Sequence, residues 1–205
     1  MAKLYFYYAA MNAGKSTTLL QTDFNYRERG METMLWTAAF DDRSGAGRIG
    51  SRIALSAPAH LYAVEVNLFD AIVAELLKRK LDCILIDEAQ FLARDHVLQL
   101  CRIADELKIP VLCYGLRTDF QGNLFPGSAA LLALADSLIE LKAVCECGRK
   151  ATMNLRVDSE GHAVAAGAQT DIGGNDRYIV LCRRHFFERL RTSEARQLTL
   201  DMPRR

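Results

Sequence analysis

The chain has 205 residues, half of them hydrophobic, and its 26 basic and 25 acidic residues leave a formal net charge of +1. A chain of this size can bury one sizeable core, which favours a compact domain with a small appendage. The balanced charge argues against a general nucleic-acid-binding protein. No apolar stretch reaches the roughly 18 residues that a membrane span needs, and no signal peptide is evident, so a cytoplasmic protein is expected.

Apolar, strand-like segments alternate with helix-like segments along the first part of the chain. Such an alternation predicts an α/β fold with a parallel sheet covered by helices on both faces. A segment rich in Gly, Ser and Arg, residues 41–56, is expected to be a mobile loop. The expected strands are residues 3–8, 32–40, 83–86, 111–116 and 137–144, and the expected helices are residues 15–29, 69–80, 92–108 and 128–135.

The sequence "AMNAGKS" stands between the first expected strand and the first expected helix, as a phosphate-binding loop does. In such a loop, backbone N–H groups and the helix N-terminus attract phosphate, a lysine reaches the β and γ oxygens, and the next Ser binds Mg²⁺. Lys15 and Ser16 fill these positions. Ala9 replaces the usual first glycine, a change that is tolerated unless the position requires positive φ. The alternative is a chance Gly-Lys-Ser at a helix start.

Asp87 and Glu88 follow the strand at residues 83–86. An aspartate there suits the Mg²⁺ shell of a phosphate-loop protein. Glu88 can face the crevice at the strand end and accept a proton from an attacking oxygen. If water attacks, the protein is an ATPase; if a substrate hydroxyl attacks, it is a kinase. "DEAQ" also resembles a helicase signature, but a helicase needs a second motor domain and a basic track. A solvated strand end without function is the remaining alternative.

Two pairs of metal-binding residue types lie in the last third of the chain, as Cys-x-Cys and Cys-x-x-His. Three thiolates and one imidazole complete a tetrahedral Zn²⁺ site and leave no open position, so the site is expected to be structural. Four scattered buried residues are the alternative. Cys83, Cys101 and Cys113 occur singly in apolar segments and are expected to be buried. The four predicted ligands are Cys145, Cys147, Cys182 and His185.

The segment "QTDIGGNDRY" lies between the two metal-binding pairs. Its Gly-Gly can simply form a hairpin turn. A segment fastened at both ends can also close over a ligand with its backbone groups, while Tyr178 adds a ring and a hydroxyl. Such main-chain bonds would suit a pyrimidine base. The change of pattern after Cys145 predicts an α/β nucleotide-binding domain at residues 1–143, a zinc-binding domain at 144–191 and a flexible tail at 192–205.

Together these pieces resemble the type II thymidine kinases, the tetrameric zinc-containing family, and bacterial members most closely. The resemblance covers the chain up to about Arg191, with the motifs in the family's order. They are "AMNAGKS", "NYRERG", "DDR", "IDEAQF", "VLCYGLRTDFQG", "LFPGS", "ELKAVCECGRKA", "IGGNDRY" and "VLCRRH".

The resemblance implies a RecA-like α/β domain, a small zinc domain with a lasso loop, and ATP-dependent, Mg²⁺-assisted phosphorylation of the 5′-hydroxyl of thymidine or deoxyuridine. It also implies inhibition by thymidine triphosphate and a homotetramer, with neither nucleic acid nor membrane as partner. By position, Glu88 would be the general base. The nucleotide site would comprise Ala9, Ala10, Met11, Asn12, Ala13, Gly14, Lys15, Ser16, Arg43, Asp87 and Gln90. The nucleoside site would comprise Phe91, Leu116, Phe120, Phe125, Ile172, Gly173, Gly174 and Tyr178.

A different class of function is also compatible with these motifs, namely an ATP-switched binding module with a zinc knuckle for nucleic acid. It would hydrolyse ATP slowly without a small acceptor and bind oligonucleotides with steep salt dependence. The near-zero net charge of the chain disfavours this alternative.

Overall fold

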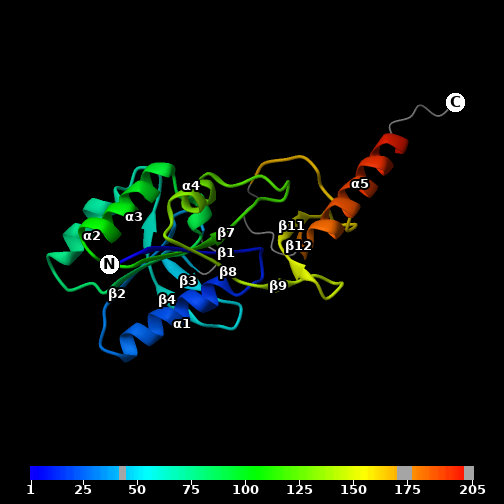
Figure 1. Ribbon diagram of the computed structural model, residues 1–205. Helices are drawn as coiled ribbons and strands as arrows, with labels where there is room; N and C mark the ends of the chain where they lie inside the picture. Colours follow the sequence, from blue (N-terminus) through cyan, green and yellow to red (C-terminus); the bar gives the residue numbers. More distant parts are fainter. Residues whose placement is uncertain (42–44, 170–176, 201–205) are drawn as a thin grey trace. The chain divides into compact units, whose positions relative to one another are not determined.

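The computed structural model describes the backbone of residues 1–41, 45–169 and 177–200, and the side chains up to Ser193 within them (Figure 1). The chain forms two compact units. The first comprises Met1–Ala9, Gly14–Arg117 and Leu124–Leu141. The second comprises Lys142–Arg205 together with two short segments from earlier in the chain, Ala10–Ala13 and Thr118–Asn123. The domain boundary at residue 143 stays a prediction.

The first unit is built on a six-stranded sheet in the order β5-β2-β6-β7-β1-β8. Every neighbouring pair in it is parallel, which confirms the predicted sheet. Strands β2 and β6 are fully buried and β7 is buried except at its last residue, as expected of parallel strands covered on both faces. The strands are β1 (Leu4–Ala9), β2 (Thr33–Ala38), β5 (His60–Tyr62), β6 (Cys83–Ile86), β7 (Val111–Leu116) and β8 (Ser137–Glu140).

Helices cover both faces of this sheet, as Figure 1 shows. Along β6, Ile84 and Ile86 pack into the core between the sheet and helices α2, α3 and α4. Cys83 and Leu85 point to the other face and pack into the core between the sheet and α1. Burying each such aliphatic side chain contributes about 1.5–3 kcal/mol. The helices are α1 (Lys15–Glu28), α2 (Leu68–Leu76), α3 (Arg94–Glu106) and α4 (Pro126–Leu134), with a 3₁₀ turn, η1 (Ala89–Phe91), after β6.

Local signals set several helix ends. Gly14 precedes α1 with φ +79°, and Gly30 follows its end with φ +71°, a conformation that glycine adopts without steric cost. The side chain of Asn67 caps α2 by accepting a hydrogen bond from the N–H of Asp70 at 3.1 Å. Helix α4 begins at Pro126, whose missing N–H costs nothing in a first helical turn.

Two sequence predictions of local structure need correction. Within the expected loop at residues 41–56, the described part contains β3 (Arg48–Gly50) and the start of β4 (Ser56–Pro58), which pair antiparallel. Ile49 and Ala57 of this hairpin are buried in the core that also contains Leu19 and Leu20 of α1, so tertiary packing stabilises the hairpin. The strand expected at residues 137–144 is two strands, β8 and β9 (Ala143–Val144).

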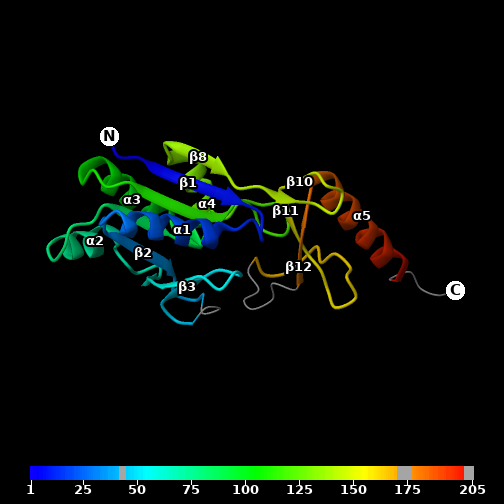
Figure 2. The ribbon, with the colours of Figure 1, turned by 90° about the horizontal axis from the view of Figure 1, so that it is seen from below.

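The second unit has two short antiparallel strand pairs and a helix. Strand β9 pairs with β10 (Lys150–Ala151), and β11 (Met153–Arg156) pairs with β12 (Tyr178–Leu181). Helix α5 (Arg183–Leu200) lies beside the β11–β12 pair in both views (Figure 2). Its backbone continues into the predicted tail, whose flexibility stays a prediction. Within the described residues, none of the helices offers the long apolar stretch that a bilayer crossing requires.

Candidate functional site

The phosphate loop has the backbone expected of an anion-binding turn. Asn12 and Gly14 are left-handed, with φ of +61° and +79°, and α1 starts at the next residue, Lys15. Left-handed residues ahead of a helix N-terminus turn backbone N–H groups toward one point, where they favour a phosphate. Ala9 ends strand β1 in register with Leu116, so it lies in extended backbone. The alanine at the first glycine position is therefore compatible with this loop.

In the first unit, the side-chain oxygens of Ser16 and Asp87 lie next to each other. The Ser16 hydroxyl donates to Oδ2 of Asp87 at 3.0 Å. Oδ1 of Asp87 is buried and accepts no hydrogen bond from the described residues. Burial, followed by the charge of Glu88, raises the pKa of Asp87 to about 7. A buried carboxylate oxygen without a partner beside a hydroxyl fits Mg²⁺, which prefers hard oxygen ligands.

Glu88 has an unusual backbone. Its φ and ψ are +52° and +34°, a left-handed conformation that costs a non-glycine residue about 1–2 kcal/mol. Its carbonyl accepts the Tyr62 hydroxyl at 2.8 Å and the N–H of Phe91 at 3.0 Å, and its carboxylate accepts a hydrogen bond from Nε2 of Gln90. Burial, and then the Glu88 and Asp87 carboxylates, raises the pKa of Tyr62 well above its usual value, so its hydroxyl stays protonated. Tyr62 was not among the residues that the sequence motifs indicated.

Gln90 connects the turn after β6 to β7. Its side chain is fully buried, and its Oε1 accepts the N–H of Leu116 at 2.9 Å while its Nε2 donates to Glu88. Gly115 makes this packing possible, because a Cβ there would lie 2.9 Å from both the backbone N and Oε1 of Gln90. Gly127 has a similar role, since its Cβ would lie 2.8 Å from the Gln90 carbonyl oxygen. A nucleotide contact by Gln90 stays a prediction, while the structure shows its amide holding Glu88.

Three of the predicted nucleoside residues gather in the first unit. Phe91 and Phe125 meet edge to face with ring centroids 5.6 Å apart, and Phe40 packs on Phe91 in the same way at 4.7 Å. Leu116 ends β7, and its carbonyl accepts the Ser128 hydroxyl at 2.5 Å. These aromatic and aliphatic side chains follow the carboxyl ends of β6 and β7, the ends at which open parallel sheets bind ligands.

The second unit holds two more predicted nucleoside residues. Phe120 is buried, and the guanidinium carbon of Arg156 lies 4.5 Å from its ring centroid, as a cation–π contact. Tyr178 lies on β12 directly opposite Arg156 in the strand register. Oδ1 of Asp119 accepts the N–H groups of Gln121 and Asn123, each at 2.9 Å, which fixes the turn around Phe120. The other predicted members, Arg43, Ile172, Gly173 and Gly174, lie outside the described residues.

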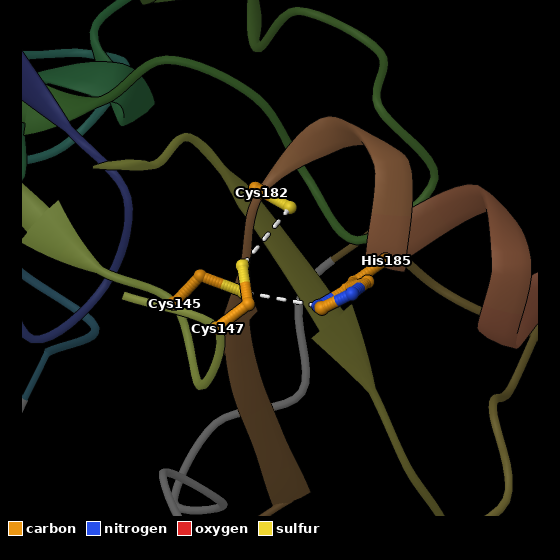
Figure 3. Close-up of side chains that lie close together, drawn as sticks. All are labelled: Cys145, Cys147, Cys182 and His185. Carbon is orange, nitrogen blue, oxygen red and sulfur yellow. Dashed lines mark hydrogen bonds between the residues drawn. The ribbon is translucent and has the colours of Figure 1, made fainter. Parts of the chain in front are cut away.

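The four predicted metal ligands converge in the second unit, as Figure 3 shows. Their ligand atoms all lie within 4.8 Å of one another. Cys145 Sγ is 3.4 Å from His185 Nδ1, and Cys147 Sγ is 3.9 Å from Cys182 Sγ. The second distance matches the edge of a tetrahedron with Zn–S bonds of about 2.3 Å, which is about 3.8 Å. A Cys₃His set of this size fits a structural Zn²⁺ with no open position.

The surroundings of the four ligands also fit a cation. Although burial opposes it, the backbone N–H groups of Cys147 and Cys182 together with His185 lower the pKa of Cys145 to about 6. The Arg149 N–H favours the Cys147 thiolate, but burial and the two neighbouring thiols raise the pKa of Cys147 overall. A positive ion among the sulfurs would favour the thiolate forms, because metal ligands of this kind bind deprotonated. Nε2 of His185 faces the carboxylate of Glu188 at 3.8 Å, a partner that orients ligating histidines.

The matching family model and the curated relatives point to one family. The family described as "Thymidine kinase" matches residues 2–186. The thymidine kinase of Novosphingobium aromaticivorans is 71% identical over 188 residues, which cover 92% of this chain and 98% of that protein. Those of Zymomonas mobilis and Haemophilus influenzae are 63% and 59% identical, over 93% and 92% of this chain and 98% of each relative. Among solved structures, the Pif1 helicase from Candida albicans matches with a TM-score of 0.41 and 16% sequence identity. The match covers 69% of this chain and 36% of the helicase chain, and this similarity is too weak to support an argument.

Proposed function

The chain belongs to the thymidine kinase family, and from this premise we propose that it transfers the γ-phosphoryl group of ATP to the 5′-hydroxyl of thymidine or deoxyuridine. The observation that carries the proposal is the fixed conformation of Glu88. Its left-handed backbone and its carboxylate are both held by hydrogen bonds, and it follows Asp87, which is bonded to Ser16 of the phosphate loop. A carboxylate fixed next to the phosphate-binding residues is suited to receive the acceptor's proton.

The donor side of the reaction depends on the phosphate loop. The backbone N–H groups of the loop and the side chain of Lys15 bind the phosphates of ATP and stabilise the charge on the transferred group. Ser16 and Asp87 would hold Mg²⁺, which when bound neutralises negative charge on the phosphate oxygens. Loss of either oxygen ligand is therefore expected to weaken the productive binding of ATP.

On the acceptor side, Glu88 accepts the proton of the 5′-hydroxyl as its oxygen attacks the γ-phosphorus. A bond forms between that oxygen and phosphorus, the bond from phosphorus to the bridging oxygen breaks, and ADP leaves with the electron pair. Phe91, Leu116, Phe120 and Phe125 border the nucleoside. Ile172 to Gly174 and Tyr178 hold its base and sugar. Exclusion of water from the bound acceptor would favour transfer over hydrolysis.

The proposal extends to three further properties that family membership supports. The Cys₃His cluster binds a structural Zn²⁺, which fastens the β9–β10 turn to the start of α5. Thymidine triphosphate inhibits the reaction by placing its phosphates in the donor loop. The active protein is a homotetramer.

A screen of nucleosides tests both the reaction and its acceptor. ATP consumption is measured with each nucleoside, and the mass of every product is determined. We expect ADP release only with thymidine or deoxyuridine, and a product heavier than the nucleoside by one phosphoryl group. ADP release at the same rate without any nucleoside would identify an ATPase instead. Binding of single-stranded DNA on a filter, with steep salt dependence, would support the nucleic-acid module.

We predict that Tyr62→Phe lowers kcat by about 3- to 10-fold, because one hydrogen bond that holds the Glu88 backbone is lost. The KM values for ATP and nucleoside should stay unchanged, since the Tyr62 hydroxyl donates to the backbone carbonyls of Asp87 and Glu88 and is not among the predicted substrate-binding residues. Steady-state kinetics, normalised to the stoichiometry of ATP binding, separate this effect from a loss of folded enzyme.

Tyr114→Phe is the matched control for this substitution. Tyr114 is equally buried, and its hydroxyl lies 3.3 Å from that of Thr22, on the α1 side of the sheet and away from Glu88. This control loses a tyrosine hydroxyl without touching the turn after β6. If both variants lose the same fraction of kcat, Tyr62 has no specific role in orienting Glu88.

A further inference from the structure

Asn154 is a polar residue at a buried position of the second unit. It lies in the middle of β11, and only 2% of its surface is exposed. Its neighbours Met153 and Leu155 point into the apolar core of this unit. Because side chains alternate along a strand, Asn154 and Arg156 share the opposite face of β11. A buried asparagine at such a position needs hydrogen-bond partners.

Both ends of the Asn154 amide are bonded to backbone. Its Oδ1 accepts the N–H of Met11 at 2.7 Å, and its Nδ2 donates to the carbonyl of Thr118 at 3.1 Å. Met11 lies in the tip of the phosphate loop, Ala10–Ala13, and Thr118 begins the segment Thr118–Asn123, which contains Phe120. One planar side chain thus bridges the tip of the donor loop and the segment that borders the acceptor.

Arg156, on the same face of β11, fastens this segment at a second point. Its guanidinium covers the ring of Phe120, and its Nη1 donates to the carbonyl of Ala168 at 3.1 Å. Nε2 of Gln169 donates to Oδ2 of Asp119 at 2.9 Å. The segment Thr118–Asn123, here called the acceptor segment, is therefore contacted by Arg156 at Phe120 and by Gln169 at Asp119. Asn154 adds the hydrogen bond to the donor loop.

We propose that Asn154 is a positioning residue for phosphoryl transfer, one that sets the spacing between the donor-loop tip and the acceptor segment. The proposal rests on the kinase function proposed above. Its amide offers one acceptor and one donor in a fixed plane, which match the N–H of Met11 and the carbonyl of Thr118. Phosphoryl transfer depends on the alignment of the attacking oxygen with the γ-phosphorus, so a small displacement of either segment is costly.

Asn154→Leu, which fills the space without either hydrogen bond, tests the proposal. We expect the Kd for ATP, measured by displacement of a fluorescent ATP analogue, to rise about tenfold, and kcat to fall about 10- to 100-fold. Bound zinc should remain stoichiometric. A general loss of folded enzyme would lower kcat but leave the Kd unchanged, so the Kd separates positioning from folding.

Leu155→Ala is the matched control. Leu155 is fully buried in the core of the same unit, next to Asn154, and its truncation is expected to destabilise that unit without removing the bridge. An unchanged Kd and kcat in Asn154→Leu, or equal changes in both variants, would overturn the proposal. If the native protein phosphorylates no nucleoside and Asn154→Leu still weakens ATP binding, the proposed kinase function is wrong, but the role of the Asn154 hydrogen bonds in shaping the donor loop is supported.

Hydrogen exchange provides a measurement that does not depend on a variant. Because its N–H is bonded to a buried side chain, the amide of Met11 should exchange slowly in the native protein, although it lies in a loop. Exchange of Met11 at the rate of an unprotected loop amide would overturn the proposal even if Asn154→Leu failed to fold.

Discussion

Glu88→Gln is expected to retain the binding of ATP and nucleoside and to lower kcat by about 10²–10⁴-fold, the usual contribution of a positioned general base. The substitution preserves size and shape. The side-chain carbonyl oxygen of the new glutamine can still accept the hydrogen bond from Nε2 of Gln90, so the turn after β6 should keep its geometry. What the variant lacks is the basicity needed to take the proton of the 5′-hydroxyl.

Binding and turnover have to be measured separately for this variant. Titration with a fluorescent ATP analogue and with labelled thymidine gives the two Kd values, and single-turnover kinetics give the rate of the chemical step. Glu28→Gln is a suitable control, because it removes one negative charge from an exposed position at the end of α1. Full turnover in Glu88→Gln would remove Glu88 from the role of general base. A large increase in either Kd would mean that Glu88 binds substrate instead.

The sequence predicted well those elements whose burial is indicated by a local run of apolar residues. The apolar runs at residues 83–86 and 111–116 are central strands with both faces covered, so nearly every residue in them is hydrophobic. The metal cluster was predictable because zinc ligands must come in close pairs of specific residue types. The family resemblance, carried by motifs spread along the chain, is confirmed by the relatives.

The elements that the sequence did not predict depend on distant contacts. Strand β5 has three residues at the edge of the sheet, and the β3–β4 hairpin overlaps the segment 41–56, which is rich in the Arg, Ser and Gly typical of loops. Nothing local to Asn154 indicates that it meets Met11 and Thr118, because both partners are brought to it only by the fold. The left-handed backbone of Glu88 has no sequence signal either, since glutamate shows no preference for that conformation.

Loss of zinc is expected to have an effect at least as large as loss of the general base. Structural Zn²⁺ contributes apparent binding free energies of about 10–16 kcal/mol in small zinc domains, more than a compact core of this size can replace. The second unit has few apolar side chains around Leu155, Leu181 and Phe186, and two short strand pairs. Cys182→Ser, or removal of zinc by a chelator, should therefore disorder this unit while the six-stranded sheet of the first unit persists.

The consequences for ligands follow from the residues that the second unit holds. Phe120 and Tyr178, proposed to contact the nucleoside, both belong to it, so nucleoside binding should fall below detection. The loop tip Ala10–Ala13 belongs to it as well, through the bond from Met11 to Asn154, so ATP affinity should also fall, by about tenfold, the value expected for Asn154→Leu. Zinc release measured with a chromogenic chelator, hydrogen exchange, and the two Kd values report these changes. Cys101→Ser, a partly buried thiol of α3 outside the cluster, should keep its zinc and its activity. Metal-free protein that retained nucleoside affinity while losing ATP binding would contradict the assignment of the acceptor residues to the zinc unit.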